Sequence, residues 1–325
     1  MRSTLARVAV AAIACGDLAC QSAPSGEVWP TQPVRLMVPF GAGSGVDMAA
    51  RLYAARLAEG WQRPVVVDNR PGPDGIVGTQ AFTSAKDGHT LLFAPTGPLT
   101  FAPHLHDDLP YDPVADFVPI ASAGRVTLTI AVAATMEASS LATLAARVRQ
   151  RPNTFLWTAP APGGPELVLK AFNVLEKLEM KQVTYRETSI ALQDIGAGRV
   201  QIVLGSLATI ASLVQAGRVK ILAVTNTIRS AAIPDIPTVT EAGYPQLTLD
   251  GQWGLFGWKG MPDDLRRRLA GDMAKAASDS ALVARLSAVG LSIDAGTPED
   301  FAVAVDRQRQ QAATLAQLSG ISRYR

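Results

Sequence analysis

The sequence predicts an α/β protein with more than one lobe. Short apolar stretches alternate with helical patterns along the chain, and this alternation is typical of α/β layers with mostly parallel strands. The chain has 325 residues, of which 48% are hydrophobic and 18% are charged. Because domains usually hold roughly 100 to 150 residues, a chain of this length and composition can bury two cores of ordinary size.

The first predicted elements lead from an apolar strand into a glycine-rich turn. The strand over 34–38 is a run of apolar residues, and the helix over 47–59 opens with an acidic residue, as the helix dipole favours. The elements that follow are a strand over 64–67, a helix over 76–85, a strand over 90–93 and a loop to residue 119.

A second set of elements continues the same alternation. It comprises strands over 126–133, 154–158, 182–185, 200–204 and 219–225, and helices over 140–150, 165–178 and 189–197. The Pro- and Gly-rich passage 233–254 indicates a return connection. Helices over 263–278, 280–289 and 298–317 complete the chain, and the first and last of them have proline and acidic residues at their starts.

Two glycine-rich loops each connect a strand to a helix. The first is Gly41-Ala42-Gly43-Ser44-Gly45, and the second runs over 69–78. A helix start leaves backbone N–H groups without intrahelical acceptors, and glycine lets an anion approach them closely. Two such loops predict one anion site, with donors from the backbone of Gly43, Ser44, Gly45, Asp74 and Gly75. Asp47 is expected to cap its helix, because an anion beside it would be repelled.

A set of motifs in this order resembles one protein family. The segment 39–47 is similar to a Pro-Phe-x-x-Gly-Gly-Gly-Thr-Asp loop, and 69–78 is similar to an Asn-Arg-Pro-Gly-x-Gly-Gly-x-x-Gly loop. Further matches lie over 86–92, 109–113, 216–225 and 236–243. These motifs are those of the Bug family, the extracytoplasmic solute receptors of tripartite tricarboxylate transporters. The resemblance extends over nearly the whole chain after its first residues.

The resemblance implies a type 2 periplasmic binding protein: two α/β lobes with a hinge and a ligand cleft. The first lobe would combine 28–124 with 252–325, and the second would be 125–251. In this family the two glycine loops hold a carboxylate of the solute, partly through water. With the ends of the third strand and the facing loops of the second lobe, the predicted ligand contacts are Gly43, Ser44, Gly45, Pro73, Asp74, Gly75, Thr96, Gly97, Ala159, Gly163, Gly164, Arg186 and Gly205.

The second lobe departs from the family pattern. Where relatives usually read Tyr-x-Ser-Ala-Gly-x-Gly-Ser, this chain has Trp157-Thr158-Ala159-Pro160-Ala161-Pro162-Gly163-Gly164, so hydroxyls are missing and two prolines remove N–H donors. Gly205 stands where Asp is common. Arg186 is a candidate for a second carboxylate, or it pairs with Glu187 or faces solvent. These changes favour a monocarboxylate or an acid with an apolar tail over a dicarboxylate.

The first residues have the pattern of an export signal. A basic start is followed by a short apolar run over 8–15, which is too short to span a bilayer, so 1–23 is predicted to be a signal peptide of a periplasmic protein. Both cysteines, Cys15 and Cys20, lie in this segment, so cysteine catalysis and disulfides are not expected. Cys20 is an alternative lipid-anchor site, although Asp17 occupies the position where a lipobox normally has Leu.

The remaining expectations concern partners. A formal net charge of +2 without a basic run argues against nucleic acid. We expect a monomer that binds a small organic acid and no cofactor, and that docks on the permease subunits of a tripartite tricarboxylate transporter. Docking on a sensor kinase, or loss of the usual ligand, are the alternatives.

An enzyme is not expected, because no nucleophile elbow, Walker loop or zinc-protease motif is present. The run His104-Leu105-His106-Asp107-Asp108 resembles a metal cluster, and a solvated loop is the preferred interpretation.

Overall fold

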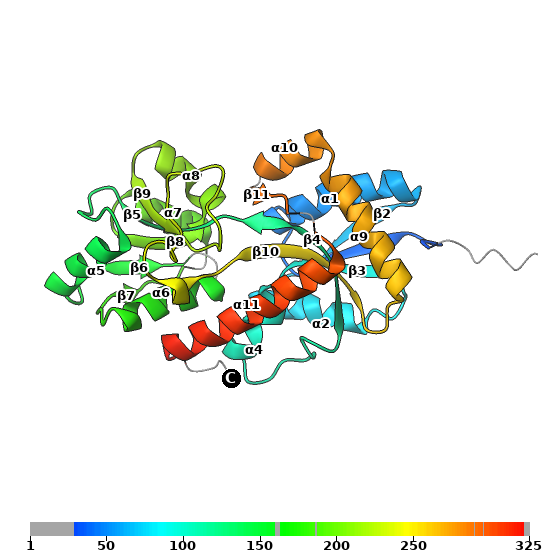
Figure 1. The fold of residues 1–325 in the computed structure, drawn as a ribbon, viewed down its shortest axis with the longest axis horizontal. Helices are drawn as coiled ribbons and strands as arrows, with labels where there is room; N and C mark the ends of the chain where they lie inside the picture. Colours follow the sequence, from blue (N-terminus) through cyan, green and yellow to red (C-terminus); the bar gives the residue numbers. More distant parts are fainter. Residues whose placement is uncertain (1–28, 160–162, 186, 289, 295, 322–325) are drawn as a thin grey trace, which may run out of the picture.

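The structure is a computed structural model that describes residues 29–159, 163–185, 187–288, 290–294 and 296–321. The predicted signal segment with Cys20, and the candidate anion ligand Arg186, lie outside the described residues. Two sheets with their helices form two lobes that lie side by side in Figure 1. Below, the first lobe is the six-stranded sheet with the elements packed on it, and the second lobe is the five-stranded sheet with its own.

The first lobe has the strand order β11-β4-β10-β3-β1-β2. Its strands are β1 (Val34–Val38), β2 (Val65–Asn69), β3 (Thr90–Pro95), β4 (Phe117–Val126), β10 (Gly251–Trp258) and β11 (Leu291–Ser292). β1 pairs with β2 and β3 in parallel, whereas β10 pairs with β3 and β4 in antiparallel fashion. The parallel strands therefore deliver both glycine-rich loops to one edge of the sheet, because parallel strands end on the same side.

The second lobe has the strand order β7-β6-β8-β5-β9. Its strands are β5 (Leu128–Ala133), β6 (Leu156–Thr158), β7 (Lys181–Gln182), β8 (Ile202–Ser206) and β9 (Val219–Val224). β6 is parallel to β7 and β8, and β5 is antiparallel to β8 and β9. Its helices are α5 (Leu141–Gln150), α6 (Gly164–Leu175), α7 (Thr188–Gly196) and α8 (Leu207–Gln215).

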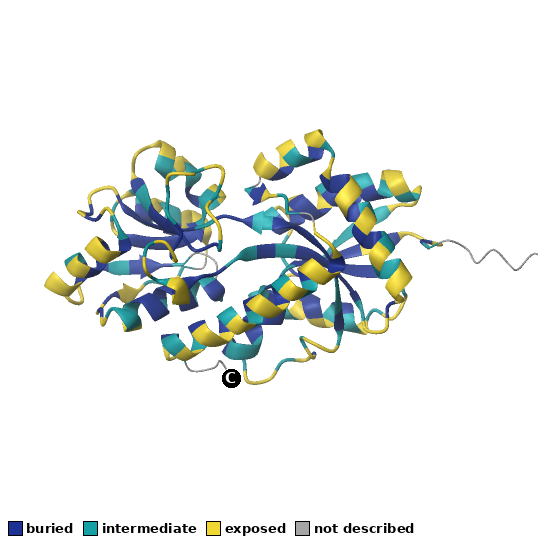
Figure 2. Ribbon diagram, viewed as in Figure 1, coloured by how far each residue is buried: buried dark blue, intermediate teal, exposed yellow. Residues whose placement is uncertain are grey.

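Helices cover both faces of the first sheet, because alternate side chains of β1 point to opposite sides. Leu36 and Val38 enter one core cluster with Tyr53 of α1 (Gly45–Trp61), whereas Met37 enters another with Phe82 of α2 (Ile76–Ser84). Figure 2 shows the sheet buried between these layers. The other helices of this lobe are α3 (Gly97–Thr100), α4 (Ala102–Leu105), α9 (Asp263–Ala277) and α10 (Ser280–Ala288).

Two strand connections and one long helix join the lobes (Figure 1). The chain leaves the first lobe between β4 and β5, and it returns from β9 to β10 through a connection that contains the 3₁₀ turn Pro245–Leu247. Helix α11 (Pro298–Ser319) packs against both lobes. Its Phe301 lies in a first-lobe cluster, and its Leu315 lies in the cluster that contains α6. None of the helices in the described residues is long and apolar enough to cross a membrane.

The structure corrects several sequence-based expectations. The strand predicted over 126–133 is β5 preceded by the end of β4. β4 begins inside the segment predicted as a loop to residue 119, and most of it lies over 120–125, where no element was predicted. The passage predicted as a connection ends in strand β10, and helices α3, α4 and α8 were not predicted. The sheets are mixed instead of mostly parallel, because strands that carry the chain between two lobes and back run in opposite directions.

Candidate functional site

A cavity of about 740 Å³ lies between the two lobes and is lined by both. Of the predicted ligand contacts, those that line it are Ser44, Gly45, Asp74, Thr96, Gly97, Gly163, Gly164 and Gly205. Gly43, Pro73 and Gly75 lie in the same loops without lining the cavity, and Ala159 packs against the second-lobe core. The folding of two lobes thus brings together residues that are more than a hundred positions apart in the chain.

The first glycine loop is closed by hydrogen bonds that set the start of α1. Ser44 is the N-cap, and its Oγ accepts from the backbone N–H of Asp47 at 3.4 Å. Asp47 Oδ2 accepts from the backbone N–H of Gly43 at 2.8 Å, and Gly43 has a φ of 81°, which glycine adopts without strain. The prediction that Asp47 caps its helix is therefore wrong: Ser44 is the N-cap, and Asp47, in the first turn, accepts from the loop before the cap.

These bonds change which donors face the cavity. Ser44 N–H donates to Gly41 O at 3.2 Å, and Gly75 N–H donates to Gly72 O at 3.1 Å. With Gly43, three of the five predicted donors are therefore already used inside their own loops. At the start of α1, the N–H groups of Gly45 and Val46 have no acceptor among the described residues, and both residues line the cavity. Of the five predicted donors, the N–H groups of Gly45 and Asp74 thus remain, and Gly45 with Val46 forms a donor pair for an anion in the first turn of α1.

Asn69 ties the second loop to the first. Its Nδ2 donates to Phe40 O at 3.1 Å and to Asp47 Oδ1 at 2.9 Å, and its Oδ1 accepts from Arg51 Nη2 at 3.0 Å. Arg51 also forms an ion pair with Asp47 at 3.0 Å. Burial alone would raise the pKa of Asp47, but the hydrogen bonds from Arg51, Gly43 and Asn69 together hold it below the ordinary value. Asp47 is thus a fixed negative charge that orders both loops from behind the cavity.

We expect Asp47→Asn to lower the free energy of unfolding by about 2 kcal/mol at neutral pH, since hydrogen bonds to a charged group are lost. Because the folded-state pKa lies below the ordinary value of 3.8, this stabilisation is complete above that value and disappears as the pH falls through the folded-state pKa. Urea unfolding of both proteins, from neutral pH down to acidic pH below the ordinary pKa, measures the difference.

The matched control for Asp47→Asn is Asp68→Asn. Asp68 pairs with Arg70 at 3.1 Å near the surface, so its loss should cost about 1 kcal/mol or less. A difference between wild type and Asp47→Asn that stays constant down to the lowest pH would contradict the assignment of the stabilisation to the Asp47 charge.

On the hinge side of the cavity, a polar network joins α11 to β10. Gln308 is 3% exposed, its Nε2 donates to Asp250 O at 2.5 Å, and its Oε1 lies within hydrogen-bond distance of Thr96 Oγ1. Thr96 Oγ1 also lies 3.1 Å from Gln252 O, and Thr96 N–H donates to the same carbonyl at 3.0 Å. The hydroxyl and N–H of Thr96 are therefore used by the hinge.

The second-lobe wall contains hydroxyl groups that the motif analysis missed. Ser206, the N-cap of α8, accepts from Thr209 N–H at 3.1 Å, and the two hydroxyl oxygens lie 2.6 Å apart. Both residues line the cavity, beside Gly205 at the end of β8. Ser206 lies two residues after the strand predicted over 200–204, and this position was a signal for such a role.

Several helix starts converge on the cavity. α1, α6 and α7 begin at Gly45, Gly164 and Thr188, which all line it, and α8 begins directly after Ser206. Each helix start carries a partial positive charge, so their convergence favours a bound anion. The arrangement supplies positive potential without a basic side chain from any of these four residues.

Much of the remaining wall is apolar. Large side chains that line the cavity are Phe40, Met48, Phe101, Leu105, Leu249 and Trp253. A Cβ atom at Gly45 would lie 3.2 Å from Trp253 Cη2, so this ring lies directly beside the start of α1. Sequence patterns did not identify these residues, because isolated apolar residues are more often part of a core. The cavity suits a solute with one anionic end and an apolar body.

The histidine run does not form a metal site in the part of the chain that is described. No group of three or more His, Cys, Asp or Glu side chains there has an arrangement suited to a metal ion. Instead, His106 Nε2 lies 2.8 Å from Oδ2 of Asp74, so it bonds to the second glycine loop. The histidine therefore fixes a residue of the cavity wall.

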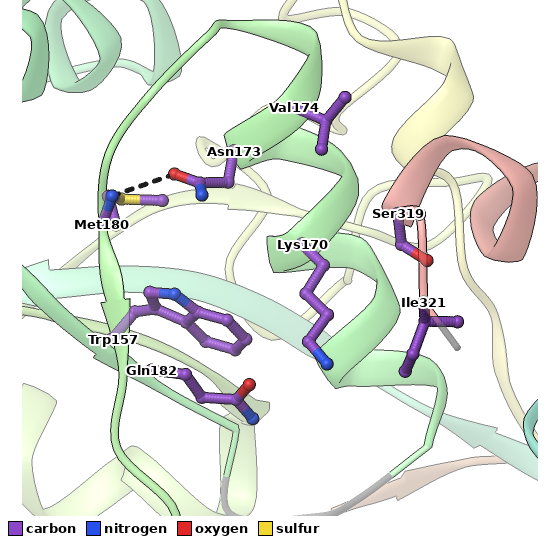
Figure 3. A pocket seen from close by; sticks show the side chains of 9 residues that line it. Trp157, Lys170, Asn173, Val174, Met180, Gln182, Ser319 and Ile321 are labelled. Atoms are coloured by element: carbon purple, nitrogen blue, oxygen red, sulfur yellow. Dashed lines mark hydrogen bonds between the residues drawn. The ribbon is translucent and has the colours of Figure 1, made fainter. Parts of the chain in front are cut away.

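A second hollow of about 510 Å³ lies on the second lobe, between α6 and the end of α11. Figure 3 shows Trp157, Lys170 and Ile321 around it. Lys170 forms an ion pair with Glu166 at 2.6 Å, and Asn173 accepts from Met180 N–H at 3.1 Å. These polar groups bond to the protein itself, and none of the predicted ligand contacts lies in this hollow.

Two α/β lobes, joined by crossing strands and enclosing a cavity at converging helix starts, define the class of two-lobed solute-binding proteins. The family profile described as "Tripartite tricarboxylate transporter family receptor" matches residues 49–320. The chain belongs to this family, and the Bug-type resemblance inferred from its motifs is confirmed.

Individual relatives agree with this assignment. The chain is 33% identical over 300 residues to a UPF0065 protein of Bordetella bronchiseptica, and the match covers 92% of this chain and 89% of the relative. It is 28% identical over 278 residues to protein BugT of Bordetella pertussis, with 85% of each chain covered. Among solved structures it resembles "R. palustris Rpa4515 with adipate", with a TM-score of 0.79, 28% identity, and 91% and 100% of the two chains covered. The predicted periplasmic binding protein fold is thus confirmed.

Proposed function

We propose that this receptor captures a small organic acid with a single carboxylate and an apolar body. The observation that carries the proposal is the start of α1, where two N–H groups without an acceptor among the described residues lie at a cavity with mainly apolar walls. Charge-assisted hydrogen bonds contribute roughly 1.5 to 3 kcal/mol each, so two of them with apolar burial support binding near micromolar. The related R. palustris protein, whose structure was solved with adipate, supports a carboxylate as the anion.

In this proposal the lobes have the bounds expected from the sequence, with 28–124 and 252–325 in one and 125–251 in the other. The solute binds the closed form better than the open form, and closure brings the walls of the cavity together around it. The receptor is exported and is a monomer. Its closed form delivers the solute to the permease subunits of a tripartite tricarboxylate transporter. It catalyses no reaction on the solute.

Thermal unfolding of the purified protein against a panel of mono-, di- and tricarboxylates tests the binding step. A ligand at about a thousand times its dissociation constant should add roughly 4 kcal/mol of stability. We expect the largest shift from an acid with one carboxylate and an apolar body. The absence of any shift with the whole panel would contradict the proposal.

Uptake of the acid that binds best tests the delivery step. Cells without the receptor should lose uptake of that acid when it is scarce, because capture then limits transport. Unchanged uptake in those cells, with binding of the purified receptor intact, would contradict the transport role and leave the binding role standing.

A further inference from the structure

Asp74 has an unusual backbone conformation in the wall of the cavity. Its φ is 49° and its ψ is 16°, in the left-handed region where glycine is free of strain and side chains rarely occur. Aspartate tolerates this region better than most residues, and such positions often have a functional reason. Here the strained position belongs to an acidic residue that lines the solute cavity.

His106 holds this carboxylate in place. Because a carboxylate only accepts hydrogen bonds, His106 Nε2 donates to Asp74 Oδ2, at 2.8 Å. Both side chains are mostly buried, with 17% of Asp74 and 19% of His106 exposed. His106 follows directly after α4, and Leu105 of that helix lines the same cavity. The carboxylate is thus fixed, before any solute arrives, by a bond from a histidine that follows a helix of the cavity wall.

The charged side chains that line the described part of the cavity are acidic, although the cavity is proposed to bind an anion. Two carboxylates line it, Asp74 and Asp250, and Asp250 accepts hydrogen bonds from the N–H and hydroxyl of Thr227 at 3.1 Å each. Among the described residues that line the cavity there is no Lys or Arg, and Arg186 is outside that part of the chain. The positive potential comes from helix starts, and it coexists with a negative side chain beside the second glycine loop.

We propose that the solute is an amino acid with an apolar side chain, whose ammonium group binds Asp74. This inference rests on the proposed function, because it places the carboxylate of the same solute at the N–H groups of Gly45 and Val46. The apolar side chain then lies against walls such as Phe40, Leu105 and Trp253. A dicarboxylate would bring a second negative charge near Asp74, so it binds more weakly.

Calorimetric titration with three probes that share a six-carbon chain tests the assignment. They are norleucine, which has an amine beside its carboxylate; hexanoate, which lacks the amine; and adipate, which has a second carboxylate. Wild type should bind norleucine about 10-fold or more tightly than hexanoate, and adipate should bind least tightly, since a charge-assisted bond is worth at least that factor. Asp74→Asn should lose this preference, with norleucine weakened about 10-fold or more and hexanoate unchanged within about threefold.

Asparagine also tolerates the left-handed region, so Asp74→Asn should remain folded, which thermal unfolding checks. Asp68→Asn is the matched control, because it removes the same charge at a residue outside the cavity and should leave all three affinities unchanged.

The outcomes separate this inference from the proposed function. Hexanoate binding wild type as tightly as norleucine would overturn the inference while the proposed function stands. Adipate binding as tightly as norleucine would overturn the inference and also the single-carboxylate part of the proposed function. An unchanged norleucine preference in Asp74→Asn would also overturn the inference. If neither these probes nor any acid of the panel binds, the proposed function itself fails.

Discussion

Gly45→Val is expected to abolish solute binding while the protein remains folded. A Cβ atom at this position would lie 3.2 Å from Trp253 Cη2, and the two methyl groups of valine would extend further over the first turn of α1. The N–H groups of Gly45 and Val46 would then be screened from the carboxylate. Losing two charge-assisted hydrogen bonds costs about 3 kcal/mol or more, which corresponds to a loss of affinity of about 100-fold or more.

The measurement is a titration with the acid that gives the largest thermal shift in the wild type. Gly60→Val is the matched control, because Gly60 lies near the other end of the same helix, is exposed, and has no neighbouring atom within 4 Å of the place that an added Cβ would take. It should bind the acid like the wild type. Normal affinity in Gly45→Val would show that the carboxylate does not bind at the start of α1.

Gly254→Ala is expected to destabilise the protein by about 3 kcal/mol or more, since overpacking of a rigid core is costly. Gly254 lies in β10, and its missing side chain leaves room for the ring of Phe301 in α11. An added Cβ would overlap that ring and lie 2.9 Å from Ala121 O of β4. A shift of either the aromatic ring or the strand backbone would itself cost free energy. Urea unfolding of the purified variant measures the loss.

Two variants show whether the Phe301 ring is the cause. In Gly257→Ala, on the same strand, the new Cβ would meet the end of the flexible Met261 side chain at 2.5 Å, so the cost should be about 1 kcal/mol. Phe301→Leu combined with Gly254→Ala should cost at least about 1 kcal/mol less than the sum of the single changes. If the losses of stability in the two single variants simply add in the double variant, contact with the Phe301 ring is not the cause of the loss in Gly254→Ala.

Local patterns predicted most of the elements that frame the cavity. β1, α1, β2 and α2 form where an apolar run, a glycine loop and a helical period follow each other in the chain. Ser44 and Asp47 fix the start of α1 within a few residues, so this part of the site depends on local chemistry alone. Such short-range signals are readable without knowledge of the rest of the fold.

The misses have a different physical origin. β4 and β10 carry several glycines and polar residues, and they become central strands only because each pairs with a partner far away in the sequence. α8 is an apolar nine-residue helix whose period is hard to distinguish from the neighbouring strands. Tertiary pairing overrides weak local preference in both strands.

By itself the sequence determined the alternating α/β architecture, the two glycine loops and the family, because these depend on local patterns and on ordered motifs. Only the tertiary structure decided which groups remain for a solute. The N–H groups of Gly43 and Gly75 are used inside their loops, and Thr96 is bonded to the hinge. Asp74 and His106, 32 residues apart, meet at the cavity wall. Hydrogen-bond partners and electrostatic neighbours are set by distances in space, which a sequence of residues does not contain.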